Sequence, residues 1–326
     1  MITSVHSDRV KFVVRLQQKA RFRFQEGLFV CEGKRLVREV PLGLLRQVYV
    51  ENGLPEADPD VVRWLRRVES AGVRTDEVTR DVMAKMAGVV HSQGILAVVE
   101  MPSFSRADLL GCIPMAVAGI GRDARPVRED STAGDVRSAE GDSAVRDARP
   151  VREDSAAGDA CRKAAGATDR QPLIMVLDGL QDPGNVGTIL RTAEAAGVTG
   201  VLSSRDTVDF YSPKVVRSTM GGIFRVPHLA VEDLGKAILQ LQSEGVRVYA
   251  SVLAEESVSY VEADFTGASA IVVGNEGAGI RDRIAGLCDR AVRIPMFGEV
   301  ESLNAGVAAG ILLFEAARQR MVEGSQ

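Results

Sequence analysis

The sequence predicts an α/β protein whose larger part is built on a parallel sheet covered by helices on both faces. Three observations lead to this fold class. From residue 172 onward, short runs of Val, Ile and Leu alternate with longer amphipathic stretches, which is typical of repeated βαβ units. The apolar runs are continuous, so both faces of the sheet are expected to be buried. Three of the runs end at loops that carry Gly and polar residues, and in such sheets ligands bind where the strands end.

Length and composition indicate how many domains the chain can form and which kinds of site to expect. The chain has 326 residues and is 45% hydrophobic, which is enough for two domains with cores of their own. The 4 Cys residues form no C-x-x-C pair and the 3 His residues are not clustered with them, so we expect no disulfide framework and no metal site. No signal peptide is recognised at the N-terminus, and the apolar run 109–121 is too short to span a bilayer. We therefore expect a soluble cytoplasmic protein.

The distribution of charge is more informative than its sum. The formal net charge is −4, which argues weakly against a nucleic-acid partner. The first 25 residues, however, contain one acidic residue among Asp and Glu, which is Asp8, and a larger number of basic residues: Arg9, Lys11, Arg15, Lys19, Arg21 and Arg23. Three phenylalanines lie between them. The stretch is compatible with an RNA-binding arm and with an amphipathic helix whose aromatic side chains face the core, and one helix can be both.

Residues 1–104 are predicted to form a small domain of alternating helices and strands. Its strands are expected at 28–32, 47–50, near 73 and at 94–101, and its helices at 7–21, 33–40, 60–72 and 81–87.

Residues 105–171 differ in composition. No aromatic residue occurs between Gly119 and Gln171, and acids and bases are densely mixed. The segment RDARPVREDS occurs twice, from Arg122 and from Arg146, as a tandem 24-residue repeat. Such a segment cannot bury enough apolar surface to offset its ordering entropy, so we predict a disordered linker.

Residues 172–326 contain the repeated βαβ units. Strands are expected at 173–180, 200–204, 224–229, 246–253, 268–274 and 291–296. Helices are expected at 185–198, 212–222, 233–245, 280–289 and in the final stretch from 300. That last helix is small and apolar over three turns, yet it opens with Glu301, Ser302 and Asn304. Ser and Asn are common helix caps, so capping alone would explain them.

Three loops at predicted strand ends carry polar residues. In the first, 177–197, Arg191 is a lone cation on an apolar helix and needs an anion, which could be a structural ion-pair partner or a ligand. The second, 271–280, has three Gly residues that permit close backbone approach, but it lacks the G-x-G-x-x-G spacing. The third, 292–306, delivers Ser302 and Asn304. Their convergence predicts a single ligand crevice.

The three loops together resemble the three motifs of the SpoU/TrmH family of RNA ribose 2′-O-methyltransferases. DPGNVGTILRTAEAAG resembles the first motif, VVGNEGAGI the second and IPMFGEVESLNAGVAAGILLFE the third. Residues 1–104 resemble the family's accessory RNA-binding domain, which is similar to ribosomal protein L30e, with FVCEGKRLVREV and HSQGILAVVE near its two ends. The long duplicated segment departs from the short connection usual in the family, so the placement of the two domains is not predicted.

The resemblance implies a trefoil-knotted fold, a homodimer and S-adenosylmethionine as cofactor. The residues implied to hold the cofactor are Gly274, Asn275, Glu276, Ile294, Met296, Leu303 and Asn304. The residues implied to be catalytic are Arg191, Asn185, Glu276, Ser302 and Asn304. We interpret Arg191 as a ligand for phosphate and for a developing alkoxide, because a guanidinium is a poor base.

The expected substrate is rRNA, with tRNA as the second candidate. The residues expected to bind RNA are Arg15, Lys19, Arg21, Arg23, Lys214 and Arg217.

Three other functions are compatible with parts of the pattern. A base methyltransferase on the same fold would resemble the chain less in the third motif. A non-catalytic RNA-binding or ribosome-assembly factor would not need all five candidate catalytic residues. A nucleotide-binding enzyme using GNEGAG as a phosphate loop is disfavoured by the absence of a following Lys and by Glu276.

Overall fold

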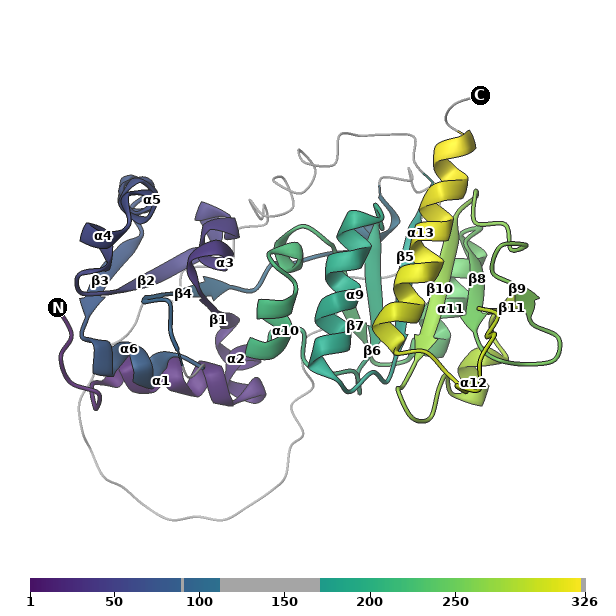
Figure 1. The fold of residues 1–326 in the computed structure, drawn as a ribbon, viewed down its shortest axis with the longest axis horizontal. Coiled ribbons are helices and arrows are strands. Elements are labelled where there is room, and N and C mark those ends of the chain that lie inside the picture. Colours follow the sequence, from purple (N-terminus) through teal and green to yellow (C-terminus); the bar gives the residue numbers. More distant parts are fainter. Residues whose placement is uncertain (89–90, 112–170, 324–326) are drawn as a thin grey trace, which may run out of the picture.

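The computed structural model describes residues 1–88, 91–111 and 171–323, and it contains two α/β units side by side (Figure 1). The N-terminal unit holds a four-stranded sheet and the C-terminal unit a seven-stranded sheet, which confirms the predicted α/β class. Most of the predicted linker, 112–170, lies outside the described residues, so its disorder stays a prediction. No helix in the described ranges is long and apolar enough to cross a membrane.

The N-terminal sheet has the strand order β1–β4–β2–β3, with antiparallel pairs β1–β4 and β2–β4 and the parallel pair β2–β3. Its strands are β1 (Leu28–Glu32), β2 (Leu45–Glu51), β3 (Arg74–Val78) and β4 (Ile95–Glu100). One face is covered by α1 (Asp8–Gln18), α2 (Ala20–Glu26) and α6 (Arg80–Met86). The other is covered by α3 (Lys34–Glu39), α4 (Leu54–Ala57) and α5 (Pro59–Ser70), so both faces are buried.

The C-terminal sheet has the order β7–β6–β5–β10–β8–β11–β9, and its neighbouring strands are parallel. Its strands are β5 (Leu173–Asp178), β6 (Gly200–Ser204), β7 (His228–Val231), β8 (Arg247–Ser251), β9 (Val258–Ser259), β10 (Ser269–Gly274) and β11 (Arg290–Arg293). Strand β5 is buried along its whole length, and β10 is buried at every residue except the last, Gly274. Parallel pairing with covered faces is the arrangement that the continuous apolar runs predicted.

Helices on both faces of this sheet position its loops. One face is covered by α9 (Pro183–Ala195), α10 (Pro213–Ser218) and α13 (Ala305–Glu323), and the other by α7 (Arg106–Leu110), α11 (Leu234–Ser243) and α12 (Asp282–Ala285). Strand β11 lies beyond β8, whereas α13 packs on α9 and β10. The chain after β11 therefore returns across the ends of β8 and β10 before α13 begins.

Two expectations about secondary structure are wrong. Residues 106–110, assigned to the linker, form α7, because a capping box between Ser105 and Asp108 starts a helix whose Leu109 and Leu110 are buried on the C-terminal sheet. The strand expected from Phe224 starts only at His228. Before it, residues 222–224 form a 3₁₀ turn, η2 (Gly222–Phe224), after two residues with positive φ at 220 and 221.

The two units share an interface of ion pairs and aromatic rings. Arg23 of α2 is 4% exposed, and its guanidinium donates to Oδ2 of Asp209 at 2.5 and 3.0 Å. Phe29 of β1 packs against Tyr211 and Phe224, with ring centroids 5.0 and 5.9 Å apart. The prediction that Arg23 binds RNA is therefore wrong, because a carboxylate of the other unit occupies its guanidinium away from solvent.

His228, at the start of β7, is buried beside this interface among the rings of Phe104, Phe210 and Tyr211. Its Nδ1 lies 2.9 Å from the carbonyl oxygen of Val226, and its Nε2 lies 3.0 Å from the Tyr211 hydroxyl. A carbonyl oxygen can only accept, so Nδ1–H donates to it and Nε2 accepts from the hydroxyl. Burial lowers the pKa of His228 to about 4, which keeps the ring neutral.

We expect this histidine to make folding stability depend on pH. Between about pH 4 and pH 6.5 the unfolded chain binds a proton on His228 that the folded chain excludes, so stability rises with pH in that window. The contribution lost by pH 4 is roughly 3 kcal/mol. Urea unfolding between pH 4 and pH 8 measures it. His228→Gln should flatten the curve there, and the exposed His6→Gln should not; an unchanged slope in His228→Gln would contradict the assignment.

Candidate active site

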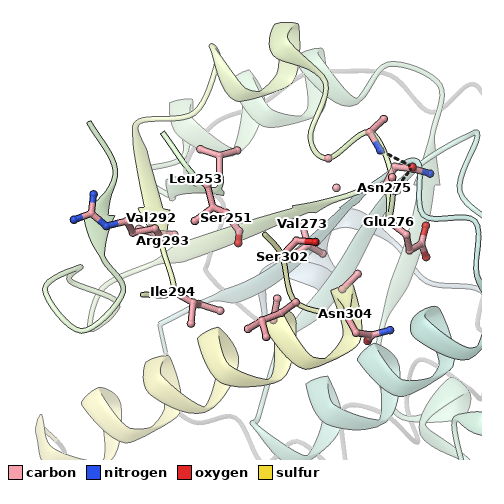
Figure 2. Close-up of a pocket in the computed structure, with 18 of the residues that line it drawn as sticks. Ser251, Leu253, Val273, Asn275, Glu276, Val292, Arg293, Ile294, Ser302 and Asn304 are labelled. Atoms are coloured by element: carbon pink, nitrogen blue, oxygen red, sulfur yellow. Dashed lines mark hydrogen bonds between the residues drawn. The ribbon is translucent and has the colours of Figure 1, made fainter. Parts of the chain in front are cut away.

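A pocket of about 400 Å³ lies at the carboxyl ends of β8, β10 and β11 (Figure 2). The loops 275–279 and 294–304 and the first turn of α13 complete its walls. The residues implied to hold the cofactor all line it: Gly274, Asn275, Glu276, Ile294, Met296, Leu303 and Asn304. Residues 251–253, at the end of β8, line it too. They were not predicted, because no Gly-rich or motif-like turn marks that strand end.

The loop 275–279 is a closed turn held by its own backbone. Asn275 and Gly279 exchange two backbone hydrogen bonds of 2.9 Å, and the Asn275 side chain donates to the carbonyl oxygen of Gly179 at 2.8 Å. A Cβ on Gly274 would lie 2.1 Å from backbone atoms of Gly279 and Ile280. Close backbone approach, the role predicted for a glycine in this loop, is therefore required at Gly274.

Asn304 joins the third loop to the first. Its Oδ1 accepts from the N–H groups of Gly306 and Val307 at 2.9 and 3.3 Å, so it caps the N-terminus of α13. Its Nδ2 donates to Oδ1 of Asn185 at 2.8 Å. Capping and a contact within the site are thus made by opposite ends of one amide.

Glu276 joins the second loop to the first. Its Oε1 accepts from Nδ2 of Asn185 at 2.9 Å and from the N–H of Asp182 at 3.1 Å, and its Oε2 accepts from the N–H of Gln181 at 3.2 Å. Burial raises the pKa of Glu276, but these hydrogen bonds outweigh it and leave the pKa below its ordinary value. Hydrogen bonds from Asn304 to Asn185 and from Asn185 to Glu276 therefore connect the three loops, and Glu276 is an ionised carboxylate.

The described residues contain no group of three acids, His or Cys that could hold a metal ion.

Arg191 lies outside this pocket, unlike Glu276, Ser302 and Asn304. It lines a second cavity of about 450 Å³, together with Arg217. The single crevice expected from the sequence is therefore divided. Arg191 is six positions after Asn185 on α9, which rotates it roughly 240° around the helix axis. Arg191 makes no hydrogen bond or ion pair with any described residue, so the structural ion-pair interpretation has no partner in that part of the chain.

The other predicted RNA-binding residues are exposed or partly exposed. The exposed members are Arg15, Lys19, Arg21 and Lys214. The Arg15 guanidinium lies 4.0 Å from the ring centroid of Phe22, and Lys214 pairs with Asp182 at 3.5 Å. The exposed bases of α1 and α2 form a surface that could contact phosphates.

Known families match both units. The SpoU rRNA methylase family matches residues 172–314, and the MRM3-like substrate binding domain matches residues 7–97. The C-terminal unit of this chain is thus a SpoU rRNA methylase domain. Its parallel sheet and the arrangement of its loops agree with that match.

Two curated relatives are similar to about half of the chain. The 23S rRNA (guanosine-2′-O-)-methyltransferase RlmB of Xanthomonas campestris is 41% identical over 155 residues, which are 48% of this chain and 62% of the relative. RlmB of Xylella fastidiosa is 44% identical over 154 residues, which are 47% of this chain and 61% of the relative. The chain thus spans about three fifths of the length of these relatives.

Solved structures of two methyltransferases resemble the whole described arrangement. An rRNA methyltransferase from Sinorhizobium meliloti, with AdoMet bound, has a TM-score of 0.70 at 26% identity and covers 97% of both chains. The SpoU methyltransferase AviRb from Streptomyces viridochromogenes has a TM-score of 0.69 at 23% identity, covers 97% of this chain and 100% of its own, and shows the same fold.

Proposed function

We propose that this protein transfers a methyl group from S-adenosylmethionine to a ribose 2′-hydroxyl of rRNA. The observation that carries the proposal is the pocket at the ends of β8, β10 and β11, whose loops 275–279 and 294–304 are both hydrogen-bonded to Asn185 of the first loop. The RlmB relatives and the AdoMet-bound neighbour support the same activity. A tRNA is the second candidate substrate.

The pocket suits an adenosyl group that carries a cationic sulfur. Its apolar wall is formed by Ile294, Met296 and Leu303. Arg293 is the only Lys or Arg among the lining residues, and its Nη1 donates to the carbonyl oxygen of Ser257 at 2.8 Å, whereas a triphosphate would need free cations. The ionised Glu276 favours a positive ligand. When bound, S-adenosylmethionine supplies an electrophilic methyl group.

The residues of the chain act by orientation and charge. Arg191 would contact an RNA phosphate and stabilise negative charge on the 2′-oxygen as the hydroxyl loses its proton. Asn185, Glu276 and Asn304 hold the loops in register, and Ser302 lines the pocket beside them. Methyl transfer is an in-line displacement, so alignment supplies much of the rate.

We propose a homodimer that uses the exposed side of α13. Val307, Phe314 and Met321 recur at a spacing of seven, so they lie along one side of the helix, and each is more than half exposed. Phe314 also lines the cavity that contains Arg191. A second copy on this side of α13 would therefore lie beside Arg191 and could bring its arginine cavity and a cofactor pocket together.

We further propose a trefoil knot, a role for each part of the chain and a cellular location. The trefoil knot is supported by the return of the chain from β11 to α13 across the ends of β8 and β10. We assign residues 1–104 to substrate binding, the segment between α7 and residue 171 to the connection, and α7 together with residues 172–326 to the catalytic unit. Because rRNA is the proposed substrate, we also propose a cytoplasmic location.

Nucleoside analysis tests the function. The full chain is incubated with rRNA and S-adenosylmethionine labelled in its methyl group, and the RNA is digested and separated by mass spectrometry. We expect label in a 2′-O-methyl nucleoside. Label in a base would indicate a base methyltransferase, and binding of S-adenosylmethionine by calorimetry without transfer would favour a non-catalytic factor. Binding of ATP instead of S-adenosylmethionine would contradict the assigned cofactor.

A further inference from the structure

The second cavity has the chemistry of an anion site. Arg191 and Arg217 both line it, together with Thr188, Thr192 and Ser218, whose hydroxyl donates to the carbonyl oxygen of Lys214 at 2.6 Å. Arg191 has no partner among the described residues, so its charge is available to a ligand. Two arginines at one cavity suit the oxygens of a phosphodiester, because Arg binds phosphate with its planar set of donors.

The second arginine is held by the other unit. Arg217 lies in the last turn of α10, and its Nη1 is 3.6 Å from Oε2 of Glu32 at the end of β1. The Arg217 side chain remains 34% exposed. One part of it therefore faces the N-terminal unit while another part lines the cavity beside Arg191.

Glu32 is an unusual partner because its side chain is only 6% exposed. The N–H of Gly88 donates to Oε2 at 3.2 Å, and Oε1 is buried with no hydrogen-bond partner in the described chain. Burial raises the pKa of Glu32 above its ordinary value, and the Gly88 hydrogen bond, the charge of Arg217 and the nearby Ser92 hydroxyl offset only part of that effect. The surrounding core and the Gly88 hydrogen bond hold the Glu32 side chain beside Arg217.

The turn after Arg217 also limits its movement. Met220 has φ 50° and Gly221 has φ 93°, so the chain leaves α10 through two residues in the left-handed region. A non-glycine residue there costs about 1–2 kcal/mol, and Met220 itself lines the cavity. The backbone on the C-terminal side of Arg217 is thus held in a specific turn at the cavity wall.

We propose that Arg191 and Arg217 together bind a backbone phosphate of the RNA, and that Glu32 of the N-terminal unit is the positioning residue for Arg217. The inference rests on the proposed function only for the identity of the ligand as RNA. It assigns the N-terminal unit a second task besides contacting RNA, because Glu32 reaches the arginine cavity of the C-terminal unit through Arg217.

A double-mutant cycle tests the positioning role. Binding of a fluorescein-labelled RNA hairpin is followed by anisotropy over a KCl series for the wild type, Arg217→Gln, Glu32→Gln and the double variant. Arg217→Gln should lower the slope of log K against log salt by about 0.7–0.9, the value for one phosphate contact. Glu32→Gln should weaken binding roughly two- to fivefold, as for the loss of a partly exposed ion pair. In the Arg217→Gln background Glu32→Gln should have no further effect.

The outcomes separate positioning from simple charge. Removal of an acid should by itself tighten RNA binding, so tighter binding by Glu32→Gln would overturn the proposal. A Glu32→Gln effect that persists in full without Arg217, or an unchanged salt slope in Arg217→Gln, would also overturn it. Glu32→Asp keeps the charge and should bind more tightly than Glu32→Gln. Should Glu32→Gln fail to fold, the slope of Arg217→Gln still decides whether the phosphate contact exists.

Glu39→Gln provides the matched control. Glu39 also pairs across the interface, with Arg225 at 2.6 Å, but it does not line the cavity and Arg225 keeps Glu194 as a second partner. The RNA affinity of the Glu39→Gln variant should stay within twofold of wild type.

The binding measurements do not require methyl transfer. Absence of transfer would therefore contradict the proposed function, and the salt slopes would still test the phosphate contact. If transfer occurs, Glu32→Gln should raise KM for RNA with little change in kcat.

Discussion

Replacing Arg191 with alanine should lower kcat for methyl transfer by roughly 10²–10³, the cost of removing one donor that stabilises transition-state charge. Affinity for S-adenosylmethionine should persist, because Arg191 does not line the cofactor pocket. Stability should change by no more than about 0.5 kcal/mol, since the side chain is exposed and no described group loses a partner. Arg191→Lys keeps the charge but loses the planar donor set, so it should restore activity only in part.

Single-turnover methylation and calorimetric titration of the cofactor measure the two effects separately. Arg283→Ala is the control, because Arg283 is an exposed arginine of α12 whose closest carboxylate, Asp233, is 3.7 Å away and which lines neither cavity. It should retain wild-type kcat. Wild-type turnover in Arg191→Ala would refute the catalytic role, and a folded Arg191→Ala protein that no longer binds the cofactor would favour a structural one.

Gly274→Ala should weaken binding of S-adenosylmethionine by roughly tenfold to more than a hundredfold. The added Cβ would lie 2.1 Å from backbone atoms of Gly279 and Ile280, and backbone cannot rotate away as a flexible side chain can. Overpacking of this kind costs about 1–3 kcal/mol, and each 1.4 kcal/mol is about tenfold in affinity. The loop 275–279 would have to move, and it forms one wall of the pocket.

Gly267→Ala is the matched control for this effect. Gly267 precedes the same strand, β10, but nothing lies within 4 Å of its hypothetical Cβ. Calorimetry should give near wild-type affinity for Gly267→Ala, and thermal unfolding shows whether Gly274→Ala remains folded. Tight cofactor binding by a folded Gly274→Ala protein would mean that the loop adapts and that the close approach is not required.

Much of the C-terminal unit was predictable because its signals are local. The buried runs at 173–178 and 269–274 are continuous and apolar, and a strand buried on both faces needs that composition wherever it lies in the sheet. Gly274 and Asn304 likewise carry their roles in short segments, as a close backbone approach and a helix cap. The signals for α7 are local too: the capping box of Ser105 and Asp108 and the apolar pair Leu109–Leu110 favour a short helix, although the overall composition of 105–171 is typical of a linker.

The sequence by itself determined the parallel α/β class and the loops that line the pocket at the strand ends, because parallel strands bring their carboxyl ends to one edge whatever the order of the strands. Only the tertiary structure shows which carboxylates the arginine side chains pair with. The sequence predicts that Arg23 binds RNA, but in the structure its guanidinium donates to the carboxylate of Asp209, 186 residues away along the chain. Glu32 meets Arg217 in the same way, across the interface. An ion pair depends on distance in space, and no periodicity in the sequence encodes which distant carboxylate an arginine will meet.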